Sequence, residues 1–508
     1  MADGLLQANG GFMALKSFNP YRAVRLVASS QILLLLVFGA IVLNIRPYIG
    51  RTTKPTYSHP IERLIEQNLK KHQEFVARQS KTPEQAVQAY KTRYKRDPPA
   101  GFLKWAQYAI QQNSSVIDDF DIIEERIAPF RSVSPADLRK RIQAWQDNAD
   151  AFETIRIEDG KTMADFDGFK KSVQDIEGDL PNMELLYNWL DEPRIIGSDA
   201  TSNEAIVENF AGKNSWSILT DKCRFPPQGE RSWRGRMPPK TQYVEDPKQA
   251  LDICSHPEFE TKHGFFNCPS NFRPTRSLVP FFAYTSMSTM SDIITPGLDY
   301  VSVSYLGGAD TVDKIPFAKK KNQVYWKAWS TGSNFTPDYW RQNHRIRFVQ
   351  RFGKHPMFNI GFSKYVQCGG FCHELEEKVG LVPSEDAKTG FGYKFAMDID
   401  GNGYSGRFYR LLLSNCLVLK QTMFVQWHDD RLVPWVHYVP VSLGLDDLEG
   451  ALEYFANDPK GQVYAAQIAE GGKLWARQVL RPVDITIYTY RLLLEYAALF
   501  DEEKTASA

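Results

Sequence analysis

The residues best suited to chemistry lie between Asp398 and Arg410, where an acidic pair, a glycine-rich loop and two arginines follow one another. Three glycines within residues 401–406 allow the main chain positive φ angles and bring its N–H groups close to an anion. Arg407 and Arg410 stand three positions apart at an expected helix start, so their side chains face one way. Such a loop is suited to a diphosphate, although a plain surface turn has the same glycine spacing.

The acidic pair has three further interpretations. Asp398 begins a stretch that matches a calcium-binding loop at its first, third, fifth and sixth positions, but Tyr409 stands at the twelfth, where a bidentate glutamate is required. Asp398 and Asp400 also form an Asp-x-Asp pattern suited to holding a divalent cation on a diphosphate. Arg407 can neutralise the same charge, so we expect neither a metal nor another cofactor. A glycosidase is disfavoured, because carboxylates two residues apart cannot flank a glycosidic bond from opposite sides.

The elements that must position this loop are short apolar runs that alternate with amphipathic segments. Strand-like runs cover residues 183–190, 300–307, 323–329 and 415–425, and helical candidates cover residues 337–352 and 445–455. This alternation predicts α/β lobes with parallel sheets. Before them, residues 46–115 are predicted to be a charged, partly helical stem, with one apolar helix face over residues 61–78 formed by Ile61, Leu64, Ile65 and Leu69.

Length and charge limit the number of domains and the class of partner to be expected. A chain of 508 residues exceeds one typical core, so two lobes with extensions are expected. The 61 basic residues are balanced by 60 acidic ones, so no whole-protein field favours nucleic acid as a partner.

Residues 26–45 contain no charged side chain and are long enough to cross a hydrocarbon core of about 30 Å. They are predicted to be a membrane anchor. A cleaved signal peptide is the alternative, but the apolar run is longer than usual and no small-residue cleavage site clearly follows it. Basic residues flank the run almost evenly, so their count does not orient it.

Six cysteines are consistent with an oxidising compartment. Spacing does not reveal their connectivity; Cys254 with Cys268 and Cys368 with Cys372 are near in sequence, and Cys223 and Cys416 remain. Cys416 lies in an apolar run and is expected to be a buried thiol. A zinc site at Cys368, Cys372 and His373 lacks a second matching pair and is disfavoured.

The segment 393–438 resembles the carboxyl-terminal signature of glycosyltransferase family 90, in its fungal capsule-associated and protein O-glucosyltransferase-like form. Further blocks of the family follow the same order at residues 94–105, 116–130, 180–196, 278–296, 324–332 and 488–500. The resemblance therefore spans roughly residues 90 to 500. It implies a GT-B-type fold, in which two Rossmann-like lobes face a cleft after a transmembrane helix and a helical stem. The implied division is a cytosolic tail (1–25), an anchor (26–45), a stem (46–150), an acceptor-side lobe (151–320), a donor-binding lobe (321–465) and carboxyl-terminal helices (466–508).

The resemblance also implies an activity. It indicates an inverting glycosyltransferase that moves a sugar, xylose or glucose, from a UDP-sugar to a hydroxyl of a glycan, glycolipid or protein. The family works in the secretory pathway, which implies a single-pass membrane protein, residence in the Golgi and a lumenal catalytic domain. Asn113 and Asn334 are then candidate N-glycosylation sites, although Pro337 lowers the expected use of the second.

Asp191 is the expected catalytic base. It follows the run 183–190 and so lies at a strand end, where a side chain can point into a cleft. Its residue type and neighbours alone favour a turn-forming aspartate, but it matches the catalytic aspartate of the family, which would deprotonate the acceptor hydroxyl, and the resemblance reverses that preference. Glu192 would point the opposite way in an extended stretch. Arg194 could hold either carboxylate, and Asp292 is expected to be structural or acceptor-side.

On the donor side, the resemblance implies contacts from Lys327, Ser330, Thr331, Gly403, Ser405, Gly406 and Arg407, with Asp398 and Asp400 in support. The chain departs from the family here, because Lys327 and Ala328 stand where Arg-Gly is usual and Trp329 replaces a small hydroxyl residue. Lysine keeps the charge and loses the bidentate geometry. The alternative is therefore an inactive relative that binds a glycan or nucleotide. Arg345 and Arg347 are expected to face different directions.

Overall fold

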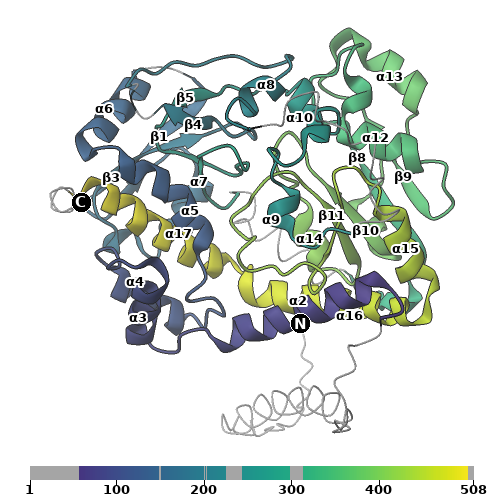
Figure 1. The fold of residues 1–508 in the computed structure, drawn as a ribbon, viewed down its shortest axis with the longest axis horizontal. Coiled ribbons are helices and arrows are strands. Elements are labelled where there is room, and N and C mark those ends of the chain that lie inside the picture. The colour runs from purple at the N-terminus through teal and green to yellow at the C-terminus, as the bar shows by residue number, and fades with distance from the viewer. Residues whose placement is uncertain are drawn as a thin grey trace, which may run out of the picture. The chain divides into compact units, whose positions relative to one another are not determined.

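Two five-stranded sheets organise the part of the chain that the computed structural model describes, namely residues 57–147, 150–199, 201, 203–224, 243–297 and 313–501 (Figure 1). Residues from His59 onward form one compact unit. The predicted membrane span 26–45 and the predicted strand 300–307 lie outside the described residues, so both stay predictions. Within the described ranges, no helix combines the length and the apolar character that crossing a membrane requires.

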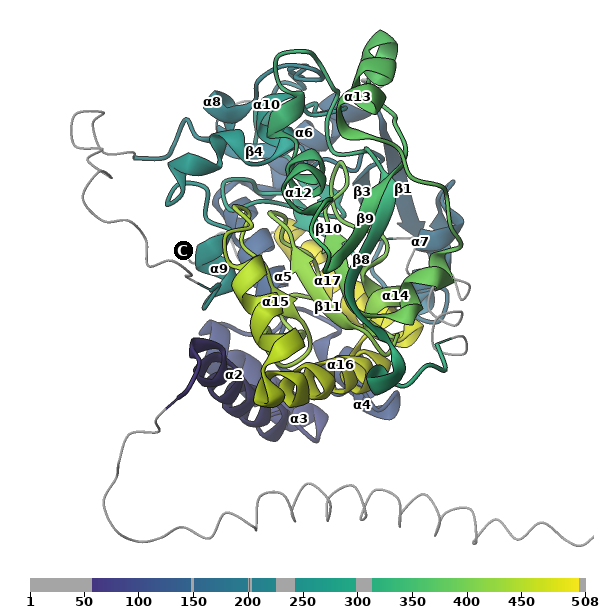
Figure 2. The same ribbon diagram turned by 90° about the vertical axis from the view of Figure 1, so that its right-hand side faces the viewer.

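One sheet is parallel throughout. Its strands are β8 (Lys321–Trp329), β9 (Phe358–Lys364), β10 (Tyr393–Ile399), β11 (Leu417–Gln421) and β12 (Val439–Pro440), in the spatial order β12-β11-β10-β8-β9. Almost every residue of β10 and β11 is buried, as expected for strands covered on both faces. Figure 2 turns these strands toward the viewer.

The order of this sheet predicts where a ligand would bind. The chain runs from β8 to the edge strand β9 through α12 (His344–Phe352), and then crosses to the other side of β8 through α13 (Cys372–Val379) to form β10. The strand order therefore reverses between β8 and β10. In open parallel sheets, ligands bind outside the carboxyl ends of the strands at such a point.

The other sheet is mixed. Its strands are β1 (Phe152–Glu158), β2 (Lys161–Met163), β3 (Met183–Asn188), β6 (Phe281–Ala283) and β7 (Ile293–Ile294), in the order β2-β1-β3-β6-β7. β3, β6 and β7 are parallel, whereas β1 is antiparallel to both of its neighbours. Asp159 and Gly160, both at positive φ, form the two-residue turn that makes β1 and β2 a hairpin. The prediction of parallel sheets is therefore only partly correct here. A short parallel pair, β4 (Ile195–Asp199) with β5 (Thr275–Ser277), completes the strands described.

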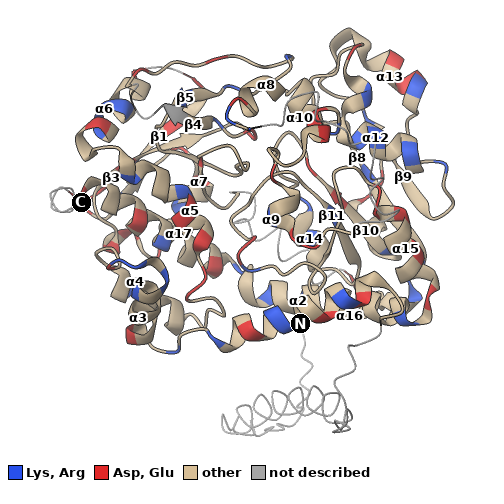
Figure 3. Ribbon diagram, in the orientation of Figure 1, with Lys and Arg blue, Asp and Glu red and all other residues tan. Residues whose placement is uncertain are grey.

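Helices cover the sheets. They are α2 (Pro60–Ala77), α3 (Pro83–Tyr94), α4 (Phe102–Gln111), α5 (Asp121–Ile127), α6 (Pro135–Gln146), α7 (Asp167–Val173), α8 (Trp216–Leu219), α9 (Pro247–Ala250), α10 (Gly264–Asn267), α14 (Phe408–Leu412), α15 (Leu448–Asn457), α16 (Pro459–Val479) and α17 (Pro482–Ala497). Nearly all of α17 is buried, and its Tyr488 and Tyr496 hydroxyls donate to the main chain of β7 and β3. Acidic and basic residues are interspersed along the helices (Figure 3).

Most predicted elements are present. The helix over 61–78 corresponds to α2, but Leu69 is 38% exposed, so its assignment to the buried face is wrong. The segment 337–352 contains a 3-10 turn (Trp340–Gln342) before α12, because the Asn343 side chain accepts the first N–H groups of α12 and starts a new helix. The segment 445–455 corresponds to α15.

The cysteines form two disulfides. Cys223 pairs with Cys254, and Cys368 pairs with Cys372, which rules out the thiolates of a zinc site there. Cys268 and Cys416 are buried free thiols, so the prediction for Cys416 is confirmed.

Candidate active site

Arg345 ties together the carboxyl ends of β8 and β10 at the point where the strand order reverses. Its guanidinium donates to Trp329 O (2.8 Å) and Thr331 Oγ1 (2.7 Å) after β8, and to Ile399 O (3.2 Å) and Asp400 O (2.7 Å) after β10. Burial, with the nearby charge of Arg407, lowers the pKa of Arg345 to about 9. One buried cation therefore joins the carboxyl ends of β8 and β10.

The sequence did not predict that Arg345 joins the carboxyl ends of β8 and β10. Arg347, two positions further along α12, donates instead to the main chain of Lys262, Leu443 and Gly444, so the two arginines do face different directions as predicted. The partners of Arg345 are main-chain groups on two strands, which no residue pattern specifies. A buried arginine in the first turn after an Asn cap is the only local signal.

The acidic pair Asp398 and Asp400 is buried and holds the start of the loop. Asp398 accepts hydrogen bonds from Ser405 Oγ (2.5 Å) and Lys420 Nζ (3.2 Å). Asp400 accepts the N–H of Met423 (2.8 Å), and burial raises its pKa to about 6. Both carboxylates, and the Ser405 hydroxyl predicted to contact the donor, are thus engaged within the protein.

The glycines of the loop act by close approach rather than by positive φ. Neither Gly401 nor Gly403 adopts a positive φ, so that expectation is wrong. A Cβ atom at Gly403 would instead lie 2.1 Å from the main-chain oxygen of Asp191. Glycine is required there because the loop presses directly against the segment that carries the expected base.

Asp191 stands on a loop fixed by buried polar contacts. The Asn188 side chain, at the end of β3, accepts from Leu190 N (3.2 Å) and donates to Glu192 O (2.8 Å), so it brackets Asp191 on both sides. The Arg194 guanidinium donates to the same Asn188 oxygen (2.7 Å). A side chain at the centre of such a clamped turn has a defined direction.

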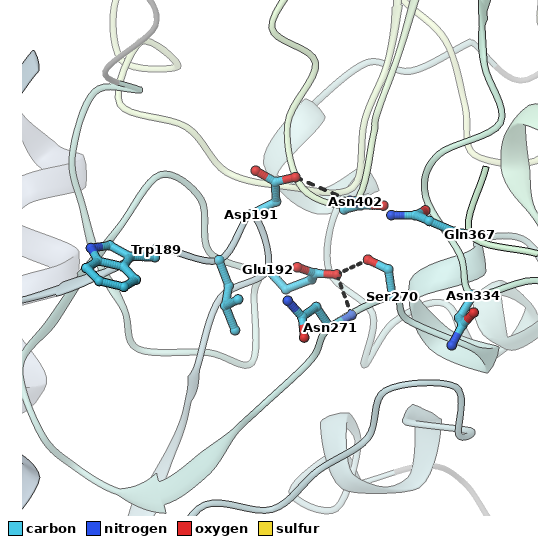
Figure 4. A pocket seen from close by; sticks show the side chains of 9 residues that line it. Trp189, Asp191, Glu192, Ser270, Asn271, Asn334, Gln367 and Asn402 are labelled. Atoms are coloured by element: carbon cyan, nitrogen blue, oxygen red, sulfur yellow. Dashed lines mark hydrogen bonds between the residues drawn. The ribbon is translucent and has the colours of Figure 1, made fainter. Parts of the chain in front are cut away.

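Asp191 opens into a pocket of about 310 Å³ (Figure 4). The pocket is lined by Trp189, Leu190, Asp191, Glu192, Ser270, Asn271, Asn334, Gln367 and Asn402. Asp191 is exposed there, whereas Glu192 is buried and accepts from Ser270 Oγ (2.5 Å) and Asn271 N (3.0 Å). Burial, with the charge of Asp191, raises the pKa of Glu192. Both carboxylates line the pocket, but Asp191 is the exposed one.

Arg194 and Asp292, two of the predicted supporting residues, do not contact the Asp191 carboxylate in the hydrogen bonds described here. Arg194 holds neither Asp191 nor Glu192, which corrects that expectation; it pairs with Asp150 (2.8 Å), which lies beside β1. Its direction is set by the turn before β4, where its N–H donates to Asp292 (2.7 Å). Asp292 is buried and also accepts from Ile195 N (3.2 Å), and burial raises its pKa to about 6. Of the two roles considered for Asp292, these contacts favour the structural one.

The predicted donor-side residues gather around the ends of β8 and the loop after β10. Lys327 Nζ contacts Glu385 Oε1 at 2.5 Å, and the Arg407 guanidinium reaches Lys327 O at 3.5 Å. The Ser330 hydroxyl donates to Val366 O and accepts from Val366 N, and Thr331 accepts from Arg345. Arg407 is partly exposed next to Gly406. The structure places these residues together, and what they bind stays a prediction.

Comparison with known proteins gives a consistent result. Residues 267–507 match the model of Glycosyl transferase family 90. Human Protein O-glucosyltransferase 3 is 31% identical over 158 residues, which is 31% of this chain and 30% of that protein. O-glucosyltransferase LpsA of Dichelobacter nodosus is 26% identical over 196 residues, which is 38% of this chain and 54% of that protein. The alignments therefore span about a third to a half of these relatives. The family match contains the loop 401–407 and begins after Asp191.

Proposed function

Residues 267–507 belong to glycosyl transferase family 90, and from that premise we propose that the protein transfers a sugar from a UDP-sugar to an acceptor hydroxyl with inversion at the anomeric carbon. One observation carries the proposal. The exposed Asp191 carboxylate lies on a segment that touches the glycine-rich loop leading to Arg407, and that loop leaves β10 where the strand order reverses. A base and an anion-binding loop are thus adjacent.

In the proposed reaction, Asp191 removes the proton of the acceptor hydroxyl as its oxygen attacks the anomeric carbon. The bond between that carbon and the UDP oxygen breaks, and the electron pair leaves with the diphosphate. Arg407 and Lys327 would neutralise the charge that develops there, so the proposal includes no metal or other cofactor. Because attack and departure occur on opposite faces of the sugar, the configuration inverts.

The pocket beside Asp191 is suited to a neutral, hydroxyl-rich acceptor. Asn271, Asn334, Gln367 and Asn402 contribute side-chain amides, which both donate and accept hydrogen bonds. Trp189 adds a half-exposed aromatic face at the same site. No lysine or arginine is among the described residues that line it. A glycan, a glycolipid headgroup or a protein hydroxyl satisfies these requirements.

The donor sugar is proposed to be glucose or xylose. The similar proteins named above carry O-glucosyltransferase in their names, which favours glucose. We further propose a GT-B arrangement, with the mixed sheet on the acceptor side and the parallel sheet on the donor side. Anchoring through residues 26–45 and a lumenal catalytic domain in the Golgi complete the proposal.

A second candidate function rests on Lys327. Its ammonium group is paired with Glu385, so it contributes less charge to a bound diphosphate than the arginine usual in the family would. The exposed Trp329 follows on the same strand. A relative that binds a nucleotide or glycan without turnover would fit these two features.

The full chain, purified in detergent, should be incubated with a panel of UDP-sugars in EDTA, and both UDP release and transfer to mixed glycan and peptide acceptors should be measured. Consumption of one donor without metal supports the transferase. UDP binding without consumption of any donor, with or without added divalent cations, would instead select the binding relative.

The compartment is tested by glycan occupancy. Asn113 is exposed after α4, whereas Asn334 lines the pocket beside Asp191 and its N–H donates to Cys268 O. A lumenal domain is expected to carry a glycan at Asn113 and none at Asn334, as read by mass spectrometry of the protein from eukaryotic cells. An unmodified Asn113 would count against the lumenal assignment.

A further inference from the structure

Asn402 links the anion-binding loop to the expected base. Its Nδ2 donates to Asp191 Oδ2 at 3.3 Å (Figure 4), and its Oδ1 accepts the N–H of Gly332 at 2.9 Å. We propose that Asn402 is a positioning residue that aims the Asp191 carboxylate and favours its ionised form. The inference rests on the proposed transferase function, to which it adds a residue that neither the sequence motifs nor the family resemblance indicated.

The orientation of the amide is fixed by its partners. A main-chain N–H can only donate, so the atom that faces Gly332 must be the amide oxygen. The NH₂ group must then face the Asp191 carboxylate, which can only accept when ionised. The opposite orientation would place two donors together on one side and two oxygens together on the other.

The position of Asn402 is set by close-packed main chain on both sides. Gly332 has a φ of 103°, and a Cβ there would lie 2.6 Å from His344 Cε1 and 2.9 Å from Gly401 O. The next residue after Asn402 is Gly403, whose missing side chain makes room for Asp191 O. Asn402 therefore has little freedom to move away from Asp191, and it joins the end of β8, the loop after β10 and the loop after β3.

The electrostatic surroundings give this contact a chemical consequence. Glu192 is the other titratable group that lines the pocket, and a second carboxylate beside Asp191 opposes its ionisation. The cations Arg345 and Arg407 bond to main-chain oxygens of Asp400 and Lys327 on the donor side of the loop. A hydrogen bond donated to a carboxylate favours the charged form. Asn402 thus supports the protonation state that a base requires, and it ties that state to the conformation of the donor loop.

The test compares Asn402→Ala and Asn402→Asp with the native protein. The alanine variant removes the hydrogen bond and is expected to lower kcat about 10- to 100-fold, because a loosened base is misplaced relative to the acceptor. The aspartate variant keeps the size and adds a negative charge beside Asp191. It is expected to move the acid limb of the kcat/KM profile to higher pH by about one unit. UDP affinity and the thermal midpoint should stay close to native in Asn402→Ala.

A matched control is Asn182→Asp. Asn182 is exposed, lies outside the pocket, and its amide also donates to an aspartate, Asp159 (3.5 Å). This variant should keep the native pH profile. If Asn402→Ala retains native kcat, or if a folded Asn402→Asp keeps the native acid limb, the inference is wrong while the transferase function stands. If the native protein transfers no sugar from any donor, the proposed function fails and this inference falls with it.

Discussion

The two sheets build their parts of the candidate site in different ways. On the parallel sheet, the site lies where strand order alone predicts a crevice, at the carboxyl ends of β8 and β10. On the mixed sheet, Asp191 is held by a loop whose shape depends on Asn188, Arg194 and Asp292. Topology therefore specifies the proposed donor side, whereas a few buried polar contacts specify the proposed acceptor side.

The family match covers the two sheets unequally. It contains all of β8–β12 but only β6 and β7 of the mixed sheet, and it begins after Asp191, so the parallel sheet is the one that the match covers completely. Acceptor choice is then to be sought in the residues before 267 and in the polar pocket beside Asp191.

The largest expected effect is on stability, from Arg194→Met on the acceptor side. Arg194 is fully buried and donates to the Asp150 carboxylate, to the main-chain oxygens of residues 150 and 151, and to Asn188. Its loss leaves Asp150 with Arg273 as its remaining cation, leaves buried acceptors without their donor and frees the turn that carries Asp191. We expect a loss of about 3–5 kcal/mol in the free energy of unfolding, measured by urea denaturation. Arg156→Met is the control, because its pair with Glu184 is exposed and is expected to contribute less than about 1 kcal/mol. Equal losses of unfolding free energy in the two variants would contradict the role of Arg194 in holding the turn that carries Asp191.

The next effect is on the pH dependence of stability. One buried aspartate near each sheet is expected to make the protein less stable as pH rises. Asp292 and Asp400 are both buried with a pKa of about 6, above the ordinary value of 3.8. Each raised pKa contributes stability that is fully present below about pH 4 and is lost as pH rises through about 6, amounting to about 3 kcal/mol.

Asp400→Asn and Asp292→Asn should therefore each weaken the decline in unfolding free energy between about pH 4 and pH 6. The measurement is urea denaturation at several pH values. A variant with the native pH dependence would show that its aspartate titrates normally in the folded protein.

The third effect is on UDP affinity, which should depend on the proposed donor side and not on the Asp191 segment. Arg407→Ala removes a guanidinium beside the glycine-rich loop and is expected to weaken UDP binding about 10- to 100-fold, as measured by calorimetry. Arg341→Ala removes an exposed arginine that stacks on Trp340 and is expected to leave UDP binding unchanged. Unaltered affinity in Arg407→Ala would place the diphosphate elsewhere.

The sequence predicted local elements better than contacts between distant segments. The runs at β3, β8 and β11 were predicted as strands, and Asp191 was predicted to follow a strand, as it does three positions after β3, whereas β10 was not among the predicted strands. Contacts between distant segments were not visible. Arg194 bonds Asp150, which is 44 positions away, and Asn402 bonds Asp191, which is 211 positions away. The role of Gly403 was predicted from its φ but arises from the approach of another loop.

We propose that catalysis and donor binding are carried by adjacent but separate groups, Asp191 and the loop that leads to Arg407. The most direct test is to measure sugar transfer and UDP affinity together in Asp191→Asn, with Asp159→Asn at the β1–β2 turn as the control. The account predicts that Asp191→Asn lowers kcat by about 10³-fold or more and keeps UDP affinity within about two-fold of native, while the control matches native in both. Transfer at a native rate by a folded Asp191→Asn variant would contradict it.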